Sequence, residues 1–249
     1  MSPARAQPSA PPDVHAKADD LRGDTVVLLH GLGLGSWAMK RFETALRRDG
    51  CQVINLSYAS RTVPLEELAA TWLPPVLRER GAESAPRLHF VTHSMGGILL
   101  RLYLRDHAPA NFGRAVMLAP PNAGSEVIDH LARVSLLRRI WSVNGARLGT
   151  GTNSVPRALG PWPGTGPLGI IAGNRSFNPL FSSWLPFPSD GKVSVASARL
   201  EGMTDFLVLP HSHTWLQWRG DTIAQTRTFL RTGRFDPIRA PTTHGVDSL

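Results

Sequence analysis

Short apolar runs alternate along most of the chain with segments in which apolar residues recur at helical spacing. The unbroken apolar runs predict strands at 25–29, 52–56, 87–92, 114–120, 167–173 and 205–210. The helical spacing predicts helices at 37–50, 65–81, 95–108 and 221–233. In the second of these, Pro74 and Pro75 predict a kink or a break. Strands that are apolar throughout and alternate with helices indicate an α/β fold, with about six mostly parallel strands flanked by helices.

The pattern also divides the chain. Residues 1–22 are rich in Pro, Ala and Ser and predict a disordered lead-in, and 236–249 predict a second loose tail. One domain is expected over 23–235. Within it, the region from about 121 to 188 is too long for a simple connection and predicts a cap or lid after the strand ending near Pro120.

Composition narrows the class of protein. The 249 residues are 42% hydrophobic and 18% charged, as in ordinary globular proteins. A single cysteine, Cys51, excludes an intramolecular disulfide. No stretch approaches the ~18 apolar residues of a membrane span, and no apolar core of a signal peptide is visible near the start. We therefore expect a cytoplasmic protein without a transmembrane segment.

The net charge of +8 raises the question of nucleic-acid binding. The basic residues are scattered, however, and form neither a Lys/Arg-rich block nor a known recognition motif. We expect a solvated basic surface and no nucleic-acid partner; the sequence identifies no partner protein.

Chemically reactive residues follow the predicted strands. On a parallel sheet, ligands bind beyond the carboxyl ends of the strands. His30-Gly31 follows the first strand, His93-Ser94 the third, and a segment beginning at Ser189 comes after the fifth. The last strand is followed by His211-Ser212-His213. A serine, an aspartate and a histidine thus occur in that order at one expected edge of the sheet.

These segments, together with PPNAGSEV after the fourth strand, resemble the α/β-hydrolase superfamily, and in particular its small lipase- and esterase-like members. LLHGLG is similar to the family's oxyanion loop, VTHSMGG to its nucleophile elbow, SDGKVSV to its acid loop and LPHSHTWL to its histidine loop. The resemblance runs from about Thr25 to Phe235. It implies an α/β-hydrolase fold with a cap.

The resemblance also implies roles for individual residues. Ser94 is expected to be the nucleophile, His213 its base and Asp190 the carboxylate that orients the base. Oxyanion-binding N–H groups are expected on Leu32 and Met95. Four further residues are expected to support the site: His30, Gly31, His93 and Gly96.

Some assignments have competitors in the sequence. His211 competes with His213 as the base, and Asp205 competes with Asp190, although Asp205 opens its strand at the wrong edge of the sheet. The family glycine two residues before the nucleophile is Thr92 here. A β-branched residue suits a strand end. We therefore expect slightly altered packing of the following helix, with Ser94 presented unchanged.

The segment 127–141 places apolar residues on one helical stripe. It predicts either a lid over an acyl pocket, able to contact a lipid surface transiently, or an amphipathic helix docked on the sheet. Aromatic side chains that could line the pocket are Trp162, Phe177, Phe181, Trp184 and Phe187.

The expected function is hydrolysis of small carboxylic esters with an apolar acyl chain through an acyl-enzyme. Neither a cofactor nor a metal is expected, since no carboxylate or cysteine stands at ligand spacing from the His-x-His pair. The alternatives are a thioesterase, amidase or acyltransferase on the same scaffold, or a non-catalytic hydrolase-like binding protein.

Overall fold

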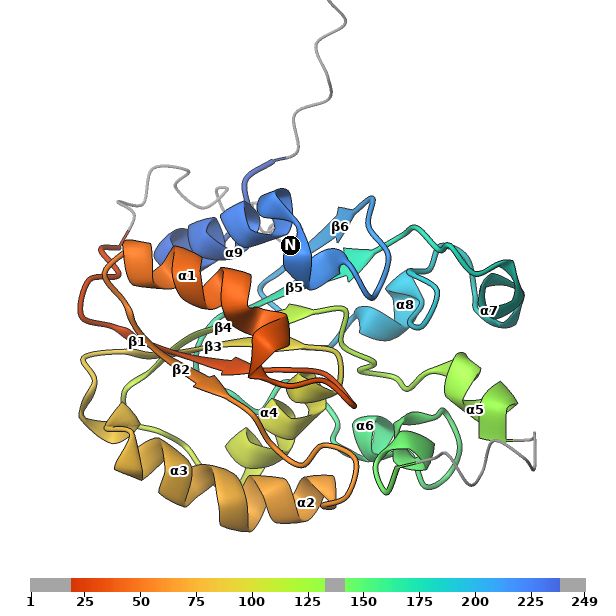
Figure 1. Ribbon diagram of the computed structural model, residues 1–249, viewed down its shortest axis with the longest axis horizontal. Helices are drawn as coiled ribbons and strands as arrows, with labels where there is room; N and C mark the ends of the chain where they lie inside the picture. The colour runs from red at the N-terminus through yellow and green to blue at the C-terminus, as the bar shows by residue number, and fades with distance from the viewer. Residues whose placement is uncertain (1–18, 133–141, 238–249) are drawn as a thin grey trace, which may run out of the picture.

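The computed structural model describes residues 19–132 and 142–237. Six strands form one parallel sheet in the order β2-β1-β3-β4-β5-β6 (Figure 1). Their bounds are β1 Thr25–Leu29, β2 Gln52–Leu56, β3 Leu88–His93, β4 Phe112–Leu118, β5 Leu168–Gly173 and β6 Asp205–Leu209. The predicted class is therefore confirmed: a six-stranded parallel sheet flanked by helices.

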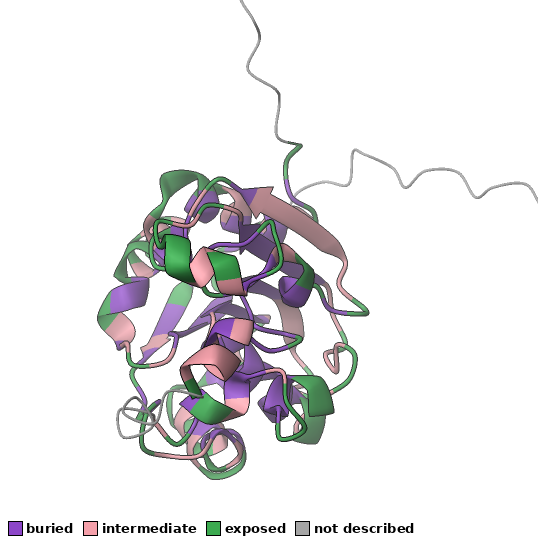
Figure 2. Ribbon diagram, turned by 90° about the vertical axis from the view of Figure 1, so that its right-hand side faces the viewer, coloured by how far each residue is buried: buried purple, intermediate pink, exposed green. Residues whose placement is uncertain are grey.

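The helices form layers on the two faces of the sheet. α1 (Lys40–Arg48) and α9 (Gly220–Thr232) cover one face, and α2 (Leu65–Glu67), α3 (Leu73–Glu79) and α4 (Met95–Asp106) cover the other (Figure 1). Four short helices lie beyond the carboxyl ends of the strands: α5 Glu126–Ala132, α6 Val155–Ala158, α7 Pro179–Trp184 and α8 Val195–Ala198. Figure 2 looks onto this end, where exposed and half-buried helices stand in front of buried strands.

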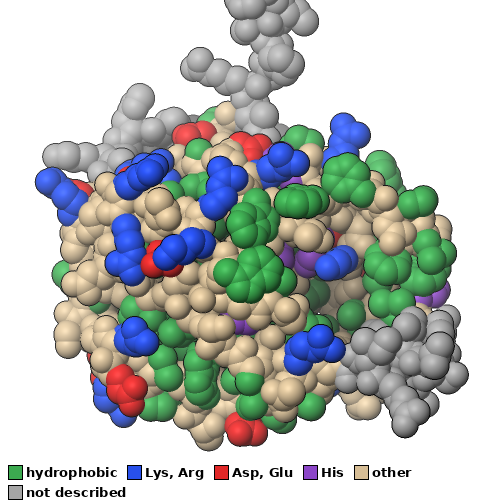
Figure 3. Space-filling model, in the orientation of Figure 1, with side chains coloured by type: hydrophobic (Ala, Val, Ile, Leu, Met, Phe, Trp, Pro, Cys, Tyr) green, Lys and Arg blue, Asp and Glu red, His purple; other side chains and the backbone are tan. Residues whose placement is uncertain are grey.

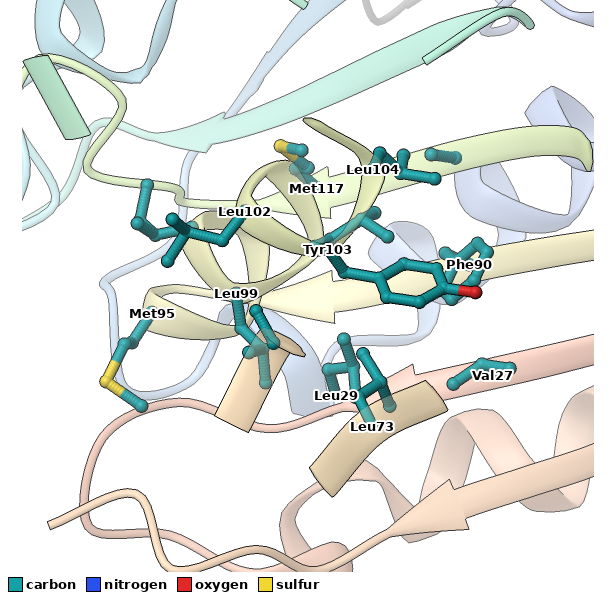
Figure 4. Packing of buried hydrophobic residues seen from close by; sticks show 14 of the residues in the cluster. Val27, Leu29, Leu73, Phe90, Met95, Leu99, Leu102, Tyr103, Leu104 and Met117 are labelled. Atoms are coloured by element: carbon teal, nitrogen blue, oxygen red, sulfur yellow. The ribbon is translucent and has the colours of Figure 1, made fainter. Parts of the chain in front are cut away.

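Each strand supplies apolar side chains to two cores, because successive side chains point to opposite faces. On β1, Val27 and Leu29 pack with α4, whereas Val26 and Leu28 pack with α1 and α9. Figure 4 shows the first of these cores between the sheet and α4. Strands buried on both faces have no polar side, which explains why they appear in the sequence as unbroken apolar runs.

The predicted helix 65–81 is irregular just before Pro74 and Pro75, but its backbone stays helical throughout 65–79. A π-helical segment, Leu68–Trp72, joins α2 to α3, and the prolines fall in the first turn of α3. A proline there loses little, because the first N–H groups of a helix have no partner within it.

Two predicted boundaries need correction. β5 lies inside the region 121–188 but pairs with β4 and β6, so the insertion consists of two separate parts on either side of this strand. The packed chain also begins before residue 23, since Leu21 is buried and Asp19 forms an ion pair with Arg114. None of the helices in the described ranges has the length and apolar character needed to cross a membrane.

Candidate active site

Ser94 occupies the sharp turn between β3 and α4. Its backbone has φ 52° and ψ −121°, and non-glycine residues rarely adopt such a positive φ. Two backbone hydrogen bonds hold it there: the Ser94 N–H donates to the Leu118 carbonyl (2.8 Å), and Gly97 N–H donates to the Ser94 carbonyl (3.0 Å). Such strain persists only where the surroundings enforce it, and it is common at functional sites.

Small residues after Ser94 let α4 approach the sheet. A Cβ on Gly96 would lie 2.5 Å from the Leu29 carbonyl oxygen and 2.8 Å from that of His30. A Cβ on Gly97 would lie 3.3 Å from Thr92 Oγ1. Thr92 is fully buried, so the volume it adds at the strand end is accommodated beside Gly97.

His213 connects Ser94 to a buried carboxylate. Its Nε2 lies 3.1 Å from Ser94 Oγ, and its Nδ1 lies 2.8 Å from Asp190 Oδ2. The side chains of His213 and Asp190 are only 6% and 1% exposed. A chain of hydrogen bonds therefore runs from the hydroxyl to a carboxylate shielded from water.

The competing residues lie elsewhere. His211 Nε2 pairs with the Asp221 carboxylate at the start of α9, at 2.7 Å. Asp205 opens β6 and accepts hydrogen bonds from the backbone N–H groups of Phe206 and Phe235. The structure thus brings His213 and Asp190, rather than His211 and Asp205, to Ser94.

The loop after β5 presents Asp190 by a tight turn. Gly191, with φ 92°, supplies the left-handed residue of this turn. Asp190 Oδ1 accepts hydrogen bonds from the backbone N–H groups of Lys192 (2.9 Å) and Val193 (2.8 Å), which leaves Oδ2 for His213. The backbone joins the two loops as well, because His213 N–H donates to the Asp190 carbonyl at 3.0 Å.

The loop after β1 lies against the serine turn. A Cβ on Gly31 would be 3.0 Å from His93 Nδ1 and 3.2 Å from Ser94 Cβ, so glycine allows this approach without displacing either side chain. His30 braces the loop: its Nδ1 donates to the Gly31 carbonyl, its Nε2 accepts from Tyr58 N–H, and its ring stacks on Tyr58. Burial lowers the pKa of His30, which favours the neutral ring that this pattern requires.

The backbone amides expected to bind an oxyanion are those of Met95 and Leu32. Met95 is the first residue of α4, so its N–H has no carbonyl one turn earlier within the helix. Leu32 lines the cavity beside Ser94, and no described residue accepts a hydrogen bond from its amide.

A cavity of about 260 Å³ opens beside Ser94. Apolar side chains form most of its wall: Leu32, Leu34, Val127, Ile128, Leu131, Leu148, Phe181 and Val193. A second cavity, of about 300 Å³, also borders His213 and shares Phe181, Lys192 and Thr214 with the first. Figure 3 shows histidine in a hollow of this face, bordered by hydrophobic and basic side chains.

Of the aromatic residues expected in the pocket, Phe181 borders both cavities and Phe177 borders the second. The other three do not line either cavity. Trp162 packs against Phe112, Trp184 stacks on His130, and Phe187 is 93% exposed.

The first part of the expected lid helix is α5, whose Val127, Ile128 and Leu131 line the cavity. The rest of the segment 127–141, from residue 133 onward, lies outside the described residues.

Two residues near the site escaped the sequence analysis. Gly173 ends β5, and a Cβ there would lie 2.3 Å from the His211 carbonyl oxygen and 2.9 Å from Asp190 Cβ, so glycine lets the two loops meet. Lys192 borders both cavities. The position of Gly173 at the end of a predicted strand could have indicated this close approach, whereas nothing in the sequence showed where the Lys192 side chain lies.

Within the two described ranges, no group of three or more His, Cys, Asp and Glu residues could hold a metal ion.

Comparison with known proteins identifies the class to which this architecture belongs. Residues 26–244 match the model of the alpha/beta hydrolase family, which is most of the sequence. The chain therefore belongs to the alpha/beta hydrolase family. None of the curated proteins matches it.

Several solved structures are similar to this chain. For the propeptide form of lipase BlEst2 from Bacillus licheniformis, the TM-score is 0.67 at 19% identity, over 85% of this chain and 51% of that one. For the mature form of the same lipase, the TM-score is 0.62 at 22% identity, over 81% of this chain and 89% of that one. For phospholipase PlaB from Legionella pneumophila, the TM-score is 0.60 at 16% identity, over 76% of this chain and 52% of that one. The chain thus spans about half the length of the first and third of these proteins, and such low identities establish a shared fold only.

Proposed function

We propose that this protein is a serine hydrolase that cleaves carboxylic esters through an acyl-enzyme on Ser94. The observation that carries the proposal is the hydrogen-bonded series Ser94 Oγ, His213 and Asp190, with separations of 3.1 and 2.8 Å, at the edge of an apolar cavity. A serine hydroxyl is a weak nucleophile at neutral pH, and a neighbouring base within hydrogen-bond reach activates it.

The first half of the reaction uses all three side chains. Ser94 Oγ forms a bond to the ester carbonyl carbon while its proton passes to His213 Nε2. Asp190 Oδ2 accepts a hydrogen bond from Nδ1, which fixes the tautomer and stabilises the imidazolium. The carbonyl oxygen becomes an oxyanion, and the N–H groups of Leu32 and Met95 bind it.

Collapse of the tetrahedral intermediate completes the reaction. The bond between the carbonyl carbon and the alcohol oxygen breaks, and His213 returns its proton to the departing alcohol. Water then attacks the acyl-enzyme with His213 again as base, which releases the carboxylic acid and restores Ser94.

The size and chemistry of the first cavity support an apolar acyl group of modest length. Pockets for drug-sized ligands measure about 300–1,000 Å³. The cavity beside Ser94 measures about 260 Å³ and is walled mostly by aliphatic side chains. Several of the similar solved structures are described as lipases or esterases, which agrees with this substrate class.

Fluorophosphonate labelling and turnover of p-nitrophenyl esters of increasing acyl length test the proposal. Labelling and turnover are expected in the wild type, absent in Ser94→Ala, and retained in Ser183→Ala, which alters an exposed serine on α7. Labelling that persists in Ser94→Ala would overturn the assignment of the nucleophile. Much faster cleavage of the thioester or amide with the same acyl group would show that one of these, and not the ester, is the preferred substrate.

A further inference from the structure

Lys192 stands between the two cavities that border His213. It follows Gly191 in the turn that presents Asp190, and it borders both the apolar cavity and the second one. Its backbone is fixed from two sides, because its N–H donates to Asp190 Oδ1 and its carbonyl accepts a hydrogen bond from Ser125 Oγ at 2.6 Å. Lys192 itself is exposed. Its ammonium group therefore extends from a fixed backbone and can reach a molecule bound in either cavity.

Within the part of the chain that the structure describes, Lys192 forms no ion pair. Desolvation by the surrounding protein lowers its pKa, and the negative charge of Asp190 offsets this only in part. A bound anion would therefore gain from a cation that is partly stripped of water and not already neutralised.

Apolar surface predominates in both cavities, but different kinds of side chain line them. The first is walled mainly by aliphatic side chains and suits an acyl chain. The second carries hydroxyl and amide groups beside aromatic rings: Ser176, Asn178, Ser212 and Thr214 with Phe177 and Trp215. Ser212 Oγ is buried and has no hydrogen-bond partner among the described residues, so this cavity offers a partner to a polar atom of an alcohol, and its aromatic rings offer apolar surface to the rest of that group.

We propose that the second cavity binds the alcohol portion of the substrate and that Lys192 selects alcohols carrying a negative charge, as a carboxylate or a phosphate. The inference rests on the proposed ester hydrolysis and names its substrate class: an apolar acyl group joined to an anionic alcohol. The chemistry is unchanged. The bond from the acyl carbon to the alcohol oxygen breaks, His213 protonates that oxygen, and the anionic alcohol leaves past Lys192.

Two esters that share one acyl group but differ in the charge of the alcohol measure the selectivity for an anionic alcohol. p-Nitrophenyl butyrate has a neutral leaving group, and the butyryl ester of hydroxynitrobenzoate adds a carboxylate to it. The ratio of kcat/KM for the anionic ester to that for the neutral one is expected to fall roughly tenfold in Lys192→Met and further in Lys192→Glu, mainly through KM. It should also fall in the wild type as salt is raised, because the ion pair is partly exposed.

A matched control removes another exposed lysine. Lys40 on α1 pairs with Glu43 and borders neither cavity, so Lys40→Met should leave the ratio at the wild-type value. Equal ratios in the wild type and Lys192→Met would overturn the inference while leaving the ester hydrolysis on Ser94 intact. So would a dependence on Lys192 seen only with mono-p-nitrophenyl succinate, whose carboxylate is on the acyl group.

Binding of the product anion tests the site without turnover. Hydroxynitrobenzoate should quench tryptophan fluorescence, since Trp215 borders the second cavity. Its Kd should rise about tenfold in Lys192→Met and stay unchanged in Lys40→Met. Equal Kd values in the wild type and Lys192→Met would reject the anion site even in a protein that failed to label at Ser94.

Discussion

His93 Nε2 donates a hydrogen bond to the backbone carbonyl oxygen of His213, at 3.1 Å. The residue before the proposed nucleophile thus holds the backbone of the proposed base, although the two are 120 residues apart in sequence. The His93 ring is buried, and its centroid lies 5.0 Å from that of His213. We therefore expect a substitution at His93 to alter the separation between Ser94 Oγ and His213 Nε2.

His93→Ala should lower kcat on the order of tenfold to a hundredfold with little change in KM, because a misplacement of about 1 Å can cost that much. His93→Gln keeps a side-chain donor and should recover part of the loss. Steady-state kinetics on p-nitrophenyl butyrate would show both effects. The control is His107→Ala at the far end of α4, where the ring contacts Tyr103. Equal losses in His93→Ala and His93→Gln would contradict a positioning role.

Gly31→Ala should impair the oxyanion loop. The added Cβ would lie 3.0 Å from His93 Nδ1 and 3.2 Å from Ser94 Cβ, so either these side chains or the loop carrying the Leu32 amide must move by a few tenths of an ångström. Loss of one oxyanion donor costs about 2.7–4 kcal/mol of barrier, and partial displacement should lower kcat by roughly tenfold to a hundredfold.

Gly151→Ala is the matched control for this loop, because a Cβ there meets nothing within 4 Å. Kinetics of both variants would be compared with their circular dichroism, which should remain at the wild-type level. Wild-type kcat in Gly31→Ala would show that the loop does not need this close approach.

The strands and the order of the site segments were predictable from the sequence for a physical reason. Strands buried on both faces must be apolar throughout, and β1 and β2 have the bounds that their apolar runs predict. The parallel topology then brings the segments after the strands to one edge. The sequence favoured His213 and left His211 as a competitor; in the structure His213 Nε2 lies beside Ser94 Oγ, whereas His211 Nε2 pairs with Asp221.

Other features depend on tertiary packing that no local pattern records. Residue type did not distinguish the exposed Phe187 from Phe181, which borders both cavities. The π-helical segment Leu68–Trp72 has no signature apart from the prolines that follow it. Lys192 shares a turn with Asp190, but only the assembled loops show that its side chain lies between two cavities.

Stability should fall as the pH drops below about 6.5, the ordinary pKa of histidine. Burial lowers the pKa of His30 and His89 and holds that of His93 well below its usual value; the charges of His213 and Lys192 lower that of His93 further. In this window the unfolded chain binds protons that the folded protein does not. The stabilisation is therefore complete above about pH 6.5 and is lost as the pH falls toward the folded pKa values.

Calorimetry between pH 7.5 and 5 would measure this as a falling Tm, at a pH above the range in which most carboxylates titrate. His93→Gln should show a shallower slope, because one of the contributing groups is gone. A Tm independent of pH, or an unchanged slope in His93→Gln, would contradict the expectation.

Thr92 provides the last prediction, because it stands where related elbows have glycine. It is fully buried, its Oγ1 has no hydrogen-bond partner among the described residues, and Gly97 leaves room for it. Thr92→Gly should lower the free energy of unfolding by about 1–2 kcal/mol, through lost packing and a more flexible strand end. Thr92→Val keeps the volume and removes the unpaired hydroxyl, so it should be at least as stable as the wild type.

Since the backbone at Ser94 is held by Leu118 and Gly97, kcat/KM should stay within about threefold of wild type in both variants of Thr92. Urea unfolding and ester turnover measure the two quantities separately, and a tenfold gain of activity in Thr92→Gly would show instead that the threonine distorts the turn.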